Sequence, residues 1–147
     1  MRAKGFYYCK FLTNCEATVA NTQYNGHVAA FDHCDYLNSC KGTASGAGTG
    51  YGARLAFDYC EYMANCQGES SGNANGTDSG VPFRHCNNIA QCRSIANCTG
   101  APGFYQCYYM TYCTSTKNFG LCFAGAKDNS TYAAADTLNG GWNRILA

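Results

Sequence analysis

The decapeptide FDYCEYMANC, residues 57–66, places two cysteines within one short stretch of aromatic and aliphatic side chains. Four other segments repeat its pattern: FYYCKFLTNC (6–15), FDHCDYLNSC (31–40), FRHCNNIAQC (83–92) and FYQCYYMTYC (104–113). The first cysteines of the five copies are separated by 25, 26, 26 and 21 residues. Such a period is typical of stacked supersecondary units, which indicates an internally repeated chain.

A short helix is the predicted structure of each copy. In the third copy, Asp58 would be the N-cap, Glu61 would complete a capping box, and Gly68 would end the helix. Phe57 and Tyr62 would pack together as a hydrophobic staple. The second copy has the equivalent residues Phe31, Asp32, Asp35, Tyr36 and Gly42. The fourth copy predicts a longer helix from the apolar stripe after Pro82, formed by Phe83, Cys86, Ile89, Cys92, Ile95 and Ala96.

The predicted fold is a small disulfide-rich repeat domain of residues 1–126, followed by an extended C-terminal arm of residues 127–147. Each of about five 26-residue units would consist of a short cysteine-bearing helix and a loop rich in Gly, Ser and Asn. An all-β, disulfide-stapled fold is the alternative. It stays open because Tyr, Phe and Thr favour strands, and because Cys60, Tyr62 and Cys66 would share one face of a strand.

The cysteines indicate a disulfide scaffold, since twelve in 147 residues is a high density and an even number. Six residues rise about 9 Å along a helix and about 20 Å along a strand, whereas a disulfide requires Cα atoms within about 7 Å. We therefore expect bonds between repeats or chains, with a connectivity that the sequence leaves open. The predicted disulfide residues are Cys9, Cys15, Cys34, Cys40, Cys60, Cys66, Cys86, Cys92, Cys98, Cys107, Cys113 and Cys122.

Metal binding and catalysis are not predicted for these thiols. Paired zinc ligands are typically spaced C-x2-4-C, which occurs nowhere in the chain. A catalytic thiol requires a lowered pKa and an oriented base, and the repeated copies single out no such cysteine. The chain also lacks the GxGxxG, P-loop and HExxH motifs. We expect no enzyme activity, no metal, no cofactor, and neither catalytic nor cofactor-binding residues.

Charge and hydropathy exclude two classes of partner. The formal net charge of +1 gives no electrostatic footprint for nucleic acid or an acidic membrane. No apolar stretch reaches the length of a transmembrane helix, and no secretory signal is visible near Met1. A disulfide-type composition without a signal predicts synthesis in a cytosol and oxidation after release. We therefore expect neither a nucleic-acid nor a membrane partner.

These features favour a non-enzymatic structural protein that covers, cements or extends a larger assembly, with copies of itself or other structural subunits as partners. The most specific expectation is a disulfide-stabilised virion surface or decoration protein of the phage type, located on the surface of a virion or an extracellular particle. The alternative is a secreted disulfide-rich binding module, an adhesin or inhibitor, that displays its loops on a stapled frame.

The C-terminal arm ends in an apolar tip that predicts an assembly contact. Trp142 is the only tryptophan, and Ile145 and Leu146 follow it closely. Large apolar side chains are unfavourable in water, and aromatic anchors dominate many protein interfaces. We expect these three residues to dock on a neighbouring subunit. The alternative is that Trp142 fills the chain's own core.

Overall fold

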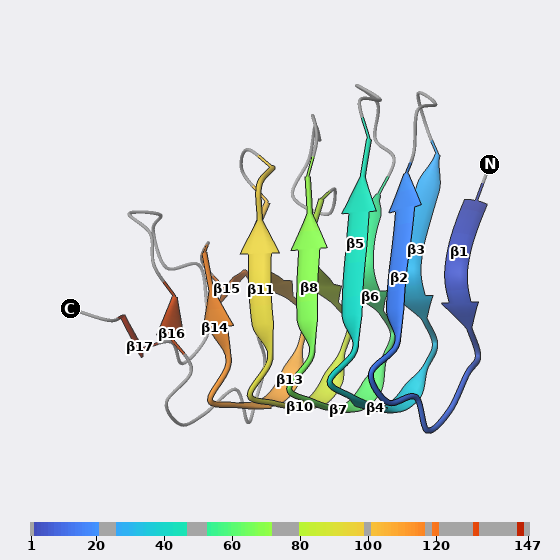
Figure 1. Ribbon diagram of the computed structural model, residues 1–147. Coiled ribbons are helices and arrows are strands. Elements are labelled where there is room, and N and C mark those ends of the chain that lie inside the picture. The colour runs from blue at the N-terminus through green and yellow to red at the C-terminus, as the bar shows by residue number, and fades with distance from the viewer. Residues whose placement is uncertain are drawn as a thin grey trace.

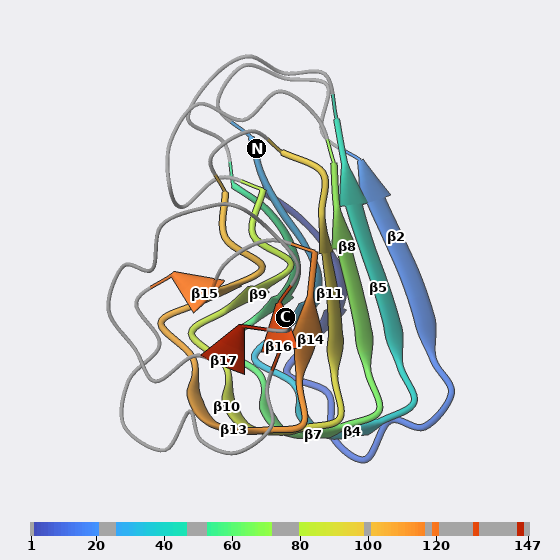
Figure 2. The ribbon, with the colours of Figure 1, turned by 90° about the vertical axis from the view of Figure 1, so that its left-hand side faces the viewer.

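The computed structural model describes residues 2–20, 26–46, 53–71, 80–98, 101–116, 119–120, 131–132 and 144–145. Strands dominate these residues, and no helix occurs among them. The chain winds into successive coils that pass through three parallel sheets (Figures 1 and 2). The molecule is therefore a β-solenoid, a stack of coils in which each strand pairs with the equivalent strand of the next coil. No described segment is a helix long and apolar enough to cross a membrane.

Within each sheet, equivalent strands of successive coils pair with one another. Sheet A contains β1 (Arg2–Tyr7), β3 (His27–Asp32), β6 (Arg54–Asp58), β9 (Phe83–Arg84), β12 (Phe104–Tyr105) and β15 (Phe119–Gly120). Sheet B contains β4 (Asp35–Asn38), β7 (Glu61–Ala64), β10 (Asn87–Ala90) and β13 (Tyr108–Thr111). Sheet C contains β2 (Glu16–Ala20), β5 (Lys41–Ser45), β8 (Gln67–Ser70), β11 (Arg93–Ala96), β14 (Thr114–Ser115), β16 (Thr131–Tyr132) and β17 (Arg144–Ile145).

Neighbouring coils pair in register, so equivalent residues of successive repeats lie side by side. We number the coils 1 to 5 by the decapeptide that each contains. The first residue of the motif forms a stack of phenylalanine rings inside the solenoid, with neighbouring ring centroids 4.7, 4.8 or 4.9 Å apart. The stack contains Phe6, Phe31, Phe57, Phe83 and Phe104. The sequence period is therefore one coil of the solenoid.

A left-handed backbone at regular intervals shapes each decapeptide. All fifteen described non-glycine residues with positive φ lie in these motifs, with φ between 49° and 57°. In coil 2 they are His33, Tyr36 and Ser39. Each is followed directly by a buried residue, namely Cys34, Leu37 and Cys40. Because one left-handed residue interrupts the alternation of a strand, every third side chain points inward.

The predicted cysteine-bearing helix is therefore wrong, and the all-β alternative fits the structure. The helical prediction failed because inward positions recur every three residues, close to the 3.6-residue period of a helix. Backbone hydrogen bonds run between coils instead: the Asn38 N–H donates to the Leu12 carbonyl at 2.9 Å. Asp58 ends strand β6 and is not an N-cap. The longer helix predicted after Pro82 is replaced by the strands β9, β10 and β11.

The predicted staple and helix ends are also wrong. Phe57 is fully buried inside the solenoid, whereas Tyr62 is 49% exposed on its outer surface. Gly42 and Gly68 lie within strands β5 and β8. A Cβ atom at Gly42 would lie 2.9 Å from the Ala56 carbonyl oxygen. The glycine is therefore required by the close packing of sheet C against sheet A.

The predicted C-terminal arm contributes two short strands to the chain's own sheet C. Strand β16 pairs with β14, and β17 pairs with β16, both in parallel. Of the predicted assembly contact, Trp142 and Leu146 lie outside the described residues. For Ile145 the structure describes only the backbone in β17. Docking of this tip on a neighbouring subunit stays a prediction.

Candidate functional site

Two columns of cysteines run through the solenoid interior. The first column contains Cys9, Cys34, Cys60, Cys86 and Cys107, and the second contains Cys15, Cys40, Cys66, Cys92 and Cys113. They follow from the motif, because its two cysteines occupy two of the inward positions. An aliphatic column of Leu12, Leu37, Met63, Ile89 and Met110 lies between them in the sequence and belongs to the same core. All eleven cysteines within the described residues are thiols in this structure.

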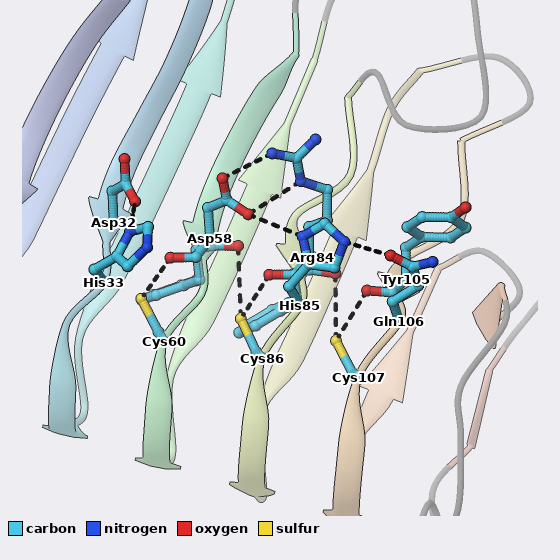
Figure 3. A network of polar contacts seen from close by, with 12 residues as sticks. Asp32, His33, Asp58, Cys60, Arg84, His85, Cys86, Tyr105, Gln106 and Cys107 are labelled. Atoms are coloured by element: carbon cyan, nitrogen blue, oxygen red, sulfur yellow. Dashed lines mark hydrogen bonds and ion pairs between the residues drawn. The ribbon is translucent and has the colours of Figure 1, made fainter.

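The thiols are satisfied by backbone carbonyls, as Figure 3 shows for three of them. Cys60 donates to the carbonyls of Asp58 at 3.4 Å and of Phe31 at 3.6 Å. Cys86 repeats this pattern one coil later, with Arg84 at 3.2 Å and Phe57 at 3.6 Å. The Cys60 and Cys86 thiols thus contact carbonyls of their own coil and of the preceding coil, which ties neighbouring coils together.

Burial makes the thiols of Cys40, Cys60, Cys86 and Cys98 less reactive. It raises the pKa of Cys60 and Cys86 well above the ordinary value, and contacts with neighbouring thiols contribute. Burial also raises the pKa of Cys40 to about 11 and shifts the pKa of Cys98 upward. The thiolate is the form that attacks electrophiles and binds metals, so these cysteines are packing residues at neutral pH. No cluster of three or more metal-ligating side chains occurs among the described residues.

A second cluster of polar residues surrounds Asp58 on the outer side of sheet A (Figure 3). The Asp58 carboxylate is nearly fully buried. It accepts hydrogen bonds from Arg84 Nε at 3.0 Å and Nη2 at 2.8 Å. His27 Nε2 and His85 Nδ1 each lie 3.6 Å from a carboxylate oxygen. Three cationic or titratable side chains therefore converge on one carboxylate.

The charges of this cluster stabilise the fold and do not make Asp58 a reactive base. Burial alone would raise the pKa of Asp58, but the contacts with His27 and Arg84 outweigh it and hold the pKa below its ordinary value. A carboxylate paired with both nitrogens of a guanidinium edge is a weak base. His27 begins β3 and Asp58 ends β6, so their contact joins opposite ends of two neighbouring strands. The cluster holds coils 2, 3 and 4 together.

His33 and His85 directly precede Cys34 and Cys86 in the sequence, but their rings do not contact these thiols. Figure 3 shows the Cys60 and Cys86 sulfurs directed to carbonyl oxygens, and the His33 and His85 rings directed to polar side chains. His33 Nδ1 contacts Asp32, and His85 Nε2 contacts Gln106. No thiol and base therefore form a nucleophilic pair in this part of the described chain.

Exposed aromatic rings form a ladder on the outer surface of the first three coils. Phe11 stacks on Tyr36 and Tyr36 on Tyr62, both with centroids 4.9 Å apart. A parallel row of alternating rings contains Tyr8, His33, Tyr59 and His85. Because the rings cover one another's faces, the ladder presents mainly ring edges to solvent. Phe11 is the most exposed of them, at 74%.

The sequence singled out the cysteines but not the Asp58 cluster. Ten of the predicted disulfide residues form the two columns, Cys98 is buried in a separate apolar cluster, and Cys122 lies outside the described residues. Oxidation of all twelve stays a prediction. The signal for the missed cluster was the residue after each phenylalanine, which is Asp32, Asp58 and Arg84 in coils 2 to 4. Its meaning depends on knowing that coils pair in register.

Comparisons with protein-family models, with curated proteins and with solved structures found no match to this chain.

Proposed function

We propose that the chain is a non-enzymatic structural protein that extends an assembly of its own copies by adding one solenoid to the next. The observation that carries the proposal is the open edge of coil 1. Figure 1 shows β1 at the end of the stack, with β3 on one side of it only. Three features of this edge support the proposal: its side chains, its backbone groups and its direction.

Coil 1 leaves part of the solenoid core uncovered. Its inward residues Phe6, Cys9, Leu12 and Cys15 are only partly buried. The equivalent residues of coil 2 are almost inaccessible, at 0% for Phe31 and Cys34 and 1% for Leu37 and Cys40. The difference arises because coil 2 is covered by a coil on each side. A further coil stacked on coil 1 would bury the same apolar surface, which favours association.

Backbone groups of coil 1 also face the open edge. In coil 2, the N–H groups of Asp35, Asn38 and Lys41 donate to carbonyls of coil 1 at 3.0, 2.9 and 2.9 Å. The equivalent donors in coil 1 are those of Lys10, Thr13 and Glu16, and no described coil lies on their side. An unpaired edge of this kind is a template for strand addition.

The direction of the strands selects head-to-tail addition. Sheet C begins with β2 at one end and finishes with β17 at the other, and Figure 1 shows these strands at opposite ends of the molecule. A second copy placed on coil 1 by its C-terminal end would continue the parallel sheets without reversal. Such a heterologous contact does not close on itself, so it generates a filament.

The proposal is tested by blocking the edge with Thr13→Pro. Proline removes the Thr13 N–H, which makes no contact with coil 2, and it disfavours strand addition. Sedimentation velocity over a range of concentrations should show that the unmodified chain associates. The Thr13→Pro variant should stay monomeric. The matched control is Asn38→Pro, which removes the equivalent N–H one coil inward and should lower the melting temperature of the monomer.

A chain that stays monomeric at every concentration would contradict the proposal, and so would a correctly folded Thr13→Pro variant that associates as before. Melting temperatures of the two variants show whether the substitutions disturb the monomer. The more specific expectation, a decoration protein on a virion, and its alternative, a secreted binding module, both stay predictions. Electron microscopy of native material would distinguish a symmetric array from single molecules.

A further inference from the structure

The open edge also exposes the ends of both cysteine columns. Cys9 and Cys15 are partly exposed, whereas the next residues of the columns, Cys34 and Cys40, are buried. The bridges Lys10↔Asp35 and Thr13↔Asn38 fix the register of coils 1 and 2. That register places Cys9 beside Cys34, and the Lys41 N–H bond to the Cys15 carbonyl places Cys15 beside Cys40.

The spacing of the coils is compatible with a disulfide in each pair. Parallel neighbours lie about 4.8 Å apart, within the Cα range of about 4.4 to 6.8 Å that a disulfide accepts. The Cβ atoms of stacked residues are about as far apart, slightly beyond the usual 3.5 to 4.5 Å, so one coil must shift by a few tenths of an ångström. Coil 1 has this freedom because only one of its edges is hydrogen-bonded to a described coil.

The cysteine pairs of the inner coils are not accessible to solvent, and their coils are not free to shift. Cys60 and Cys86 are inaccessible to solvent. Their coils are hydrogen-bonded on both edges. Thiol–disulfide exchange requires an accessible thiolate in line with the attacked sulfur, and burial keeps these inner thiols protonated. Because the other described cysteines are all inaccessible to solvent, oxidation among them must begin at Cys9 and Cys15 of coil 1.

We propose that the Cys9–Cys34 and Cys15–Cys40 pairs are redox modification sites that a small-molecule disulfide oxidises in the folded protein. This inference does not depend on the proposed assembly. In the first step the Cys9 thiolate attacks glutathione disulfide, forms a mixed disulfide and releases one glutathione. In the second step the Cys34 thiolate attacks Cys9 Sγ, forms the Cys9–Cys34 bond and releases the other glutathione.

The two steps balance, because two cysteine sulfurs are oxidised while one glutathione disulfide is reduced to two glutathione molecules. The two cysteine protons pass through solvent to the two glutathione thiolates that are released. The second step is slowed by the raised pKa of Cys34, which arises from its contact with the Cys60 thiol and from burial. The fixed position of Cys34 beside the mixed disulfide offsets this, since the reaction is intramolecular. Cys15 and Cys40 follow the same sequence.

The experiment treats the reduced full-length chain with glutathione disulfide at mildly alkaline pH, at a concentration where sedimentation shows a monomer. Remaining thiols are then alkylated and the disulfides are mapped by mass spectrometry of peptides. We expect Cys9–Cys34 and Cys15–Cys40 bonds, with Cys60 and Cys86 still alkylated as free thiols. A Cys9–Cys15 bond, a mixed disulfide at Cys9 that never resolves, or earlier oxidation of Cys60 and Cys86 would overturn the proposal.

Two serine variants test whether oxidation of the Cys9–Cys34 pair depends on Cys9 alone or on other cysteines of the same column. Cys9→Ser removes a partly exposed thiol, so Cys34 should stay reduced while Cys15–Cys40 still forms. Cys107→Ser removes a thiol of the same column at coil 5, and both expected bonds should form at unchanged rates. Oxidation of Cys34 in the Cys9→Ser variant, at the rate of the unmodified chain, would show that access through coil 1 is not required.

Discussion

Asp58 shows how single polar residues stabilise the outer layer of the solenoid. Its carboxylate is almost inaccessible, and two hydrogen bonds from Arg84 connect coil 3 to coil 4. By contrast, the Lys10–Asp35 pair at 3.2 Å is much more exposed, with side-chain exposures of 61% for Lys10 and 27% for Asp35. Exposed pairs contribute little to stability, whereas a hydrogen bond between buried charged groups contributes about 1.5 to 3 kcal/mol. The two aspartates are therefore a matched comparison.

Stability should fall in acid because of Asp58. Contacts with His27 and Arg84 hold its folded-state pKa below the ordinary value of 3.8, despite burial. Its stabilising contribution is therefore complete above that pH and is lost as pH falls through the folded-state pKa. Asp58→Asn should lower the free energy of unfolding by about 1.5 to 3 kcal/mol at neutral pH. It should also flatten the dependence of stability on acid below about pH 4.

Chemical denaturation at several pH values measures both effects, with Asp35→Asn as the control. The control should change stability by less than about 1 kcal/mol, because its ion pair is exposed. If Asp58→Asn and Asp35→Asn had the same free energy of unfolding at neutral pH, Asp58 would contribute no more to stability than an exposed aspartate. An unchanged acid dependence in Asp58→Asn would assign the pH effect to other carboxylates.

At the scale of elements, the strands of sheet C depend on glycine for their close approach to sheet A. Gly42→Ala should destabilise the fold by about 1 to 3 kcal/mol, the range of core overpacking. The new methyl group would meet the Ala56 carbonyl oxygen at 2.9 Å and the Ala56 side chain at 3.2 Å. Thr43→Ala, on the next residue of β5, is the control and should have little effect. Thermal unfolding measures both, and equal melting temperatures would contradict the packing of these sheets.

The sequence predicted the repeat and the apolar stripe of its fourth copy, but not the kind of element. The stripe Phe83, Cys86, Ile89 and Cys92 does point inward, with every member buried. It was assigned to a helix because a three-residue period resembles helical spacing. The deciding feature was the left-handed backbone at His85, Asn88 and Gln91. Single-residue preferences reveal it poorly, because many such positions hold tyrosine, which rarely adopts positive φ.

The contacts between neighbouring coils could not be predicted from the sequence for a related reason. Asp58 and Arg84 are 26 residues apart. Nothing in either decapeptide alone indicates their contact. Once the period is recognised as one coil, the contact follows, because residues one period apart lie side by side. The cysteines show the same dependence: their spacing excluded bonds within a regular element, and only the solenoid places Cys9 beside Cys34.

For the whole molecule, the proposed assembly requires coil 1 to be an edge that another copy covers. The most direct measurement is amide hydrogen exchange at Thr13 as the protein concentration rises. The Asn38 N–H is bonded to Leu12 in the monomer, so Asn38 should be protected at every concentration. The Thr13 N–H faces the open edge, so it should exchange rapidly in dilute protein and become protected as association proceeds. Fast exchange at Thr13 in the associated protein would contradict the account, and so would protection in the dilute monomer.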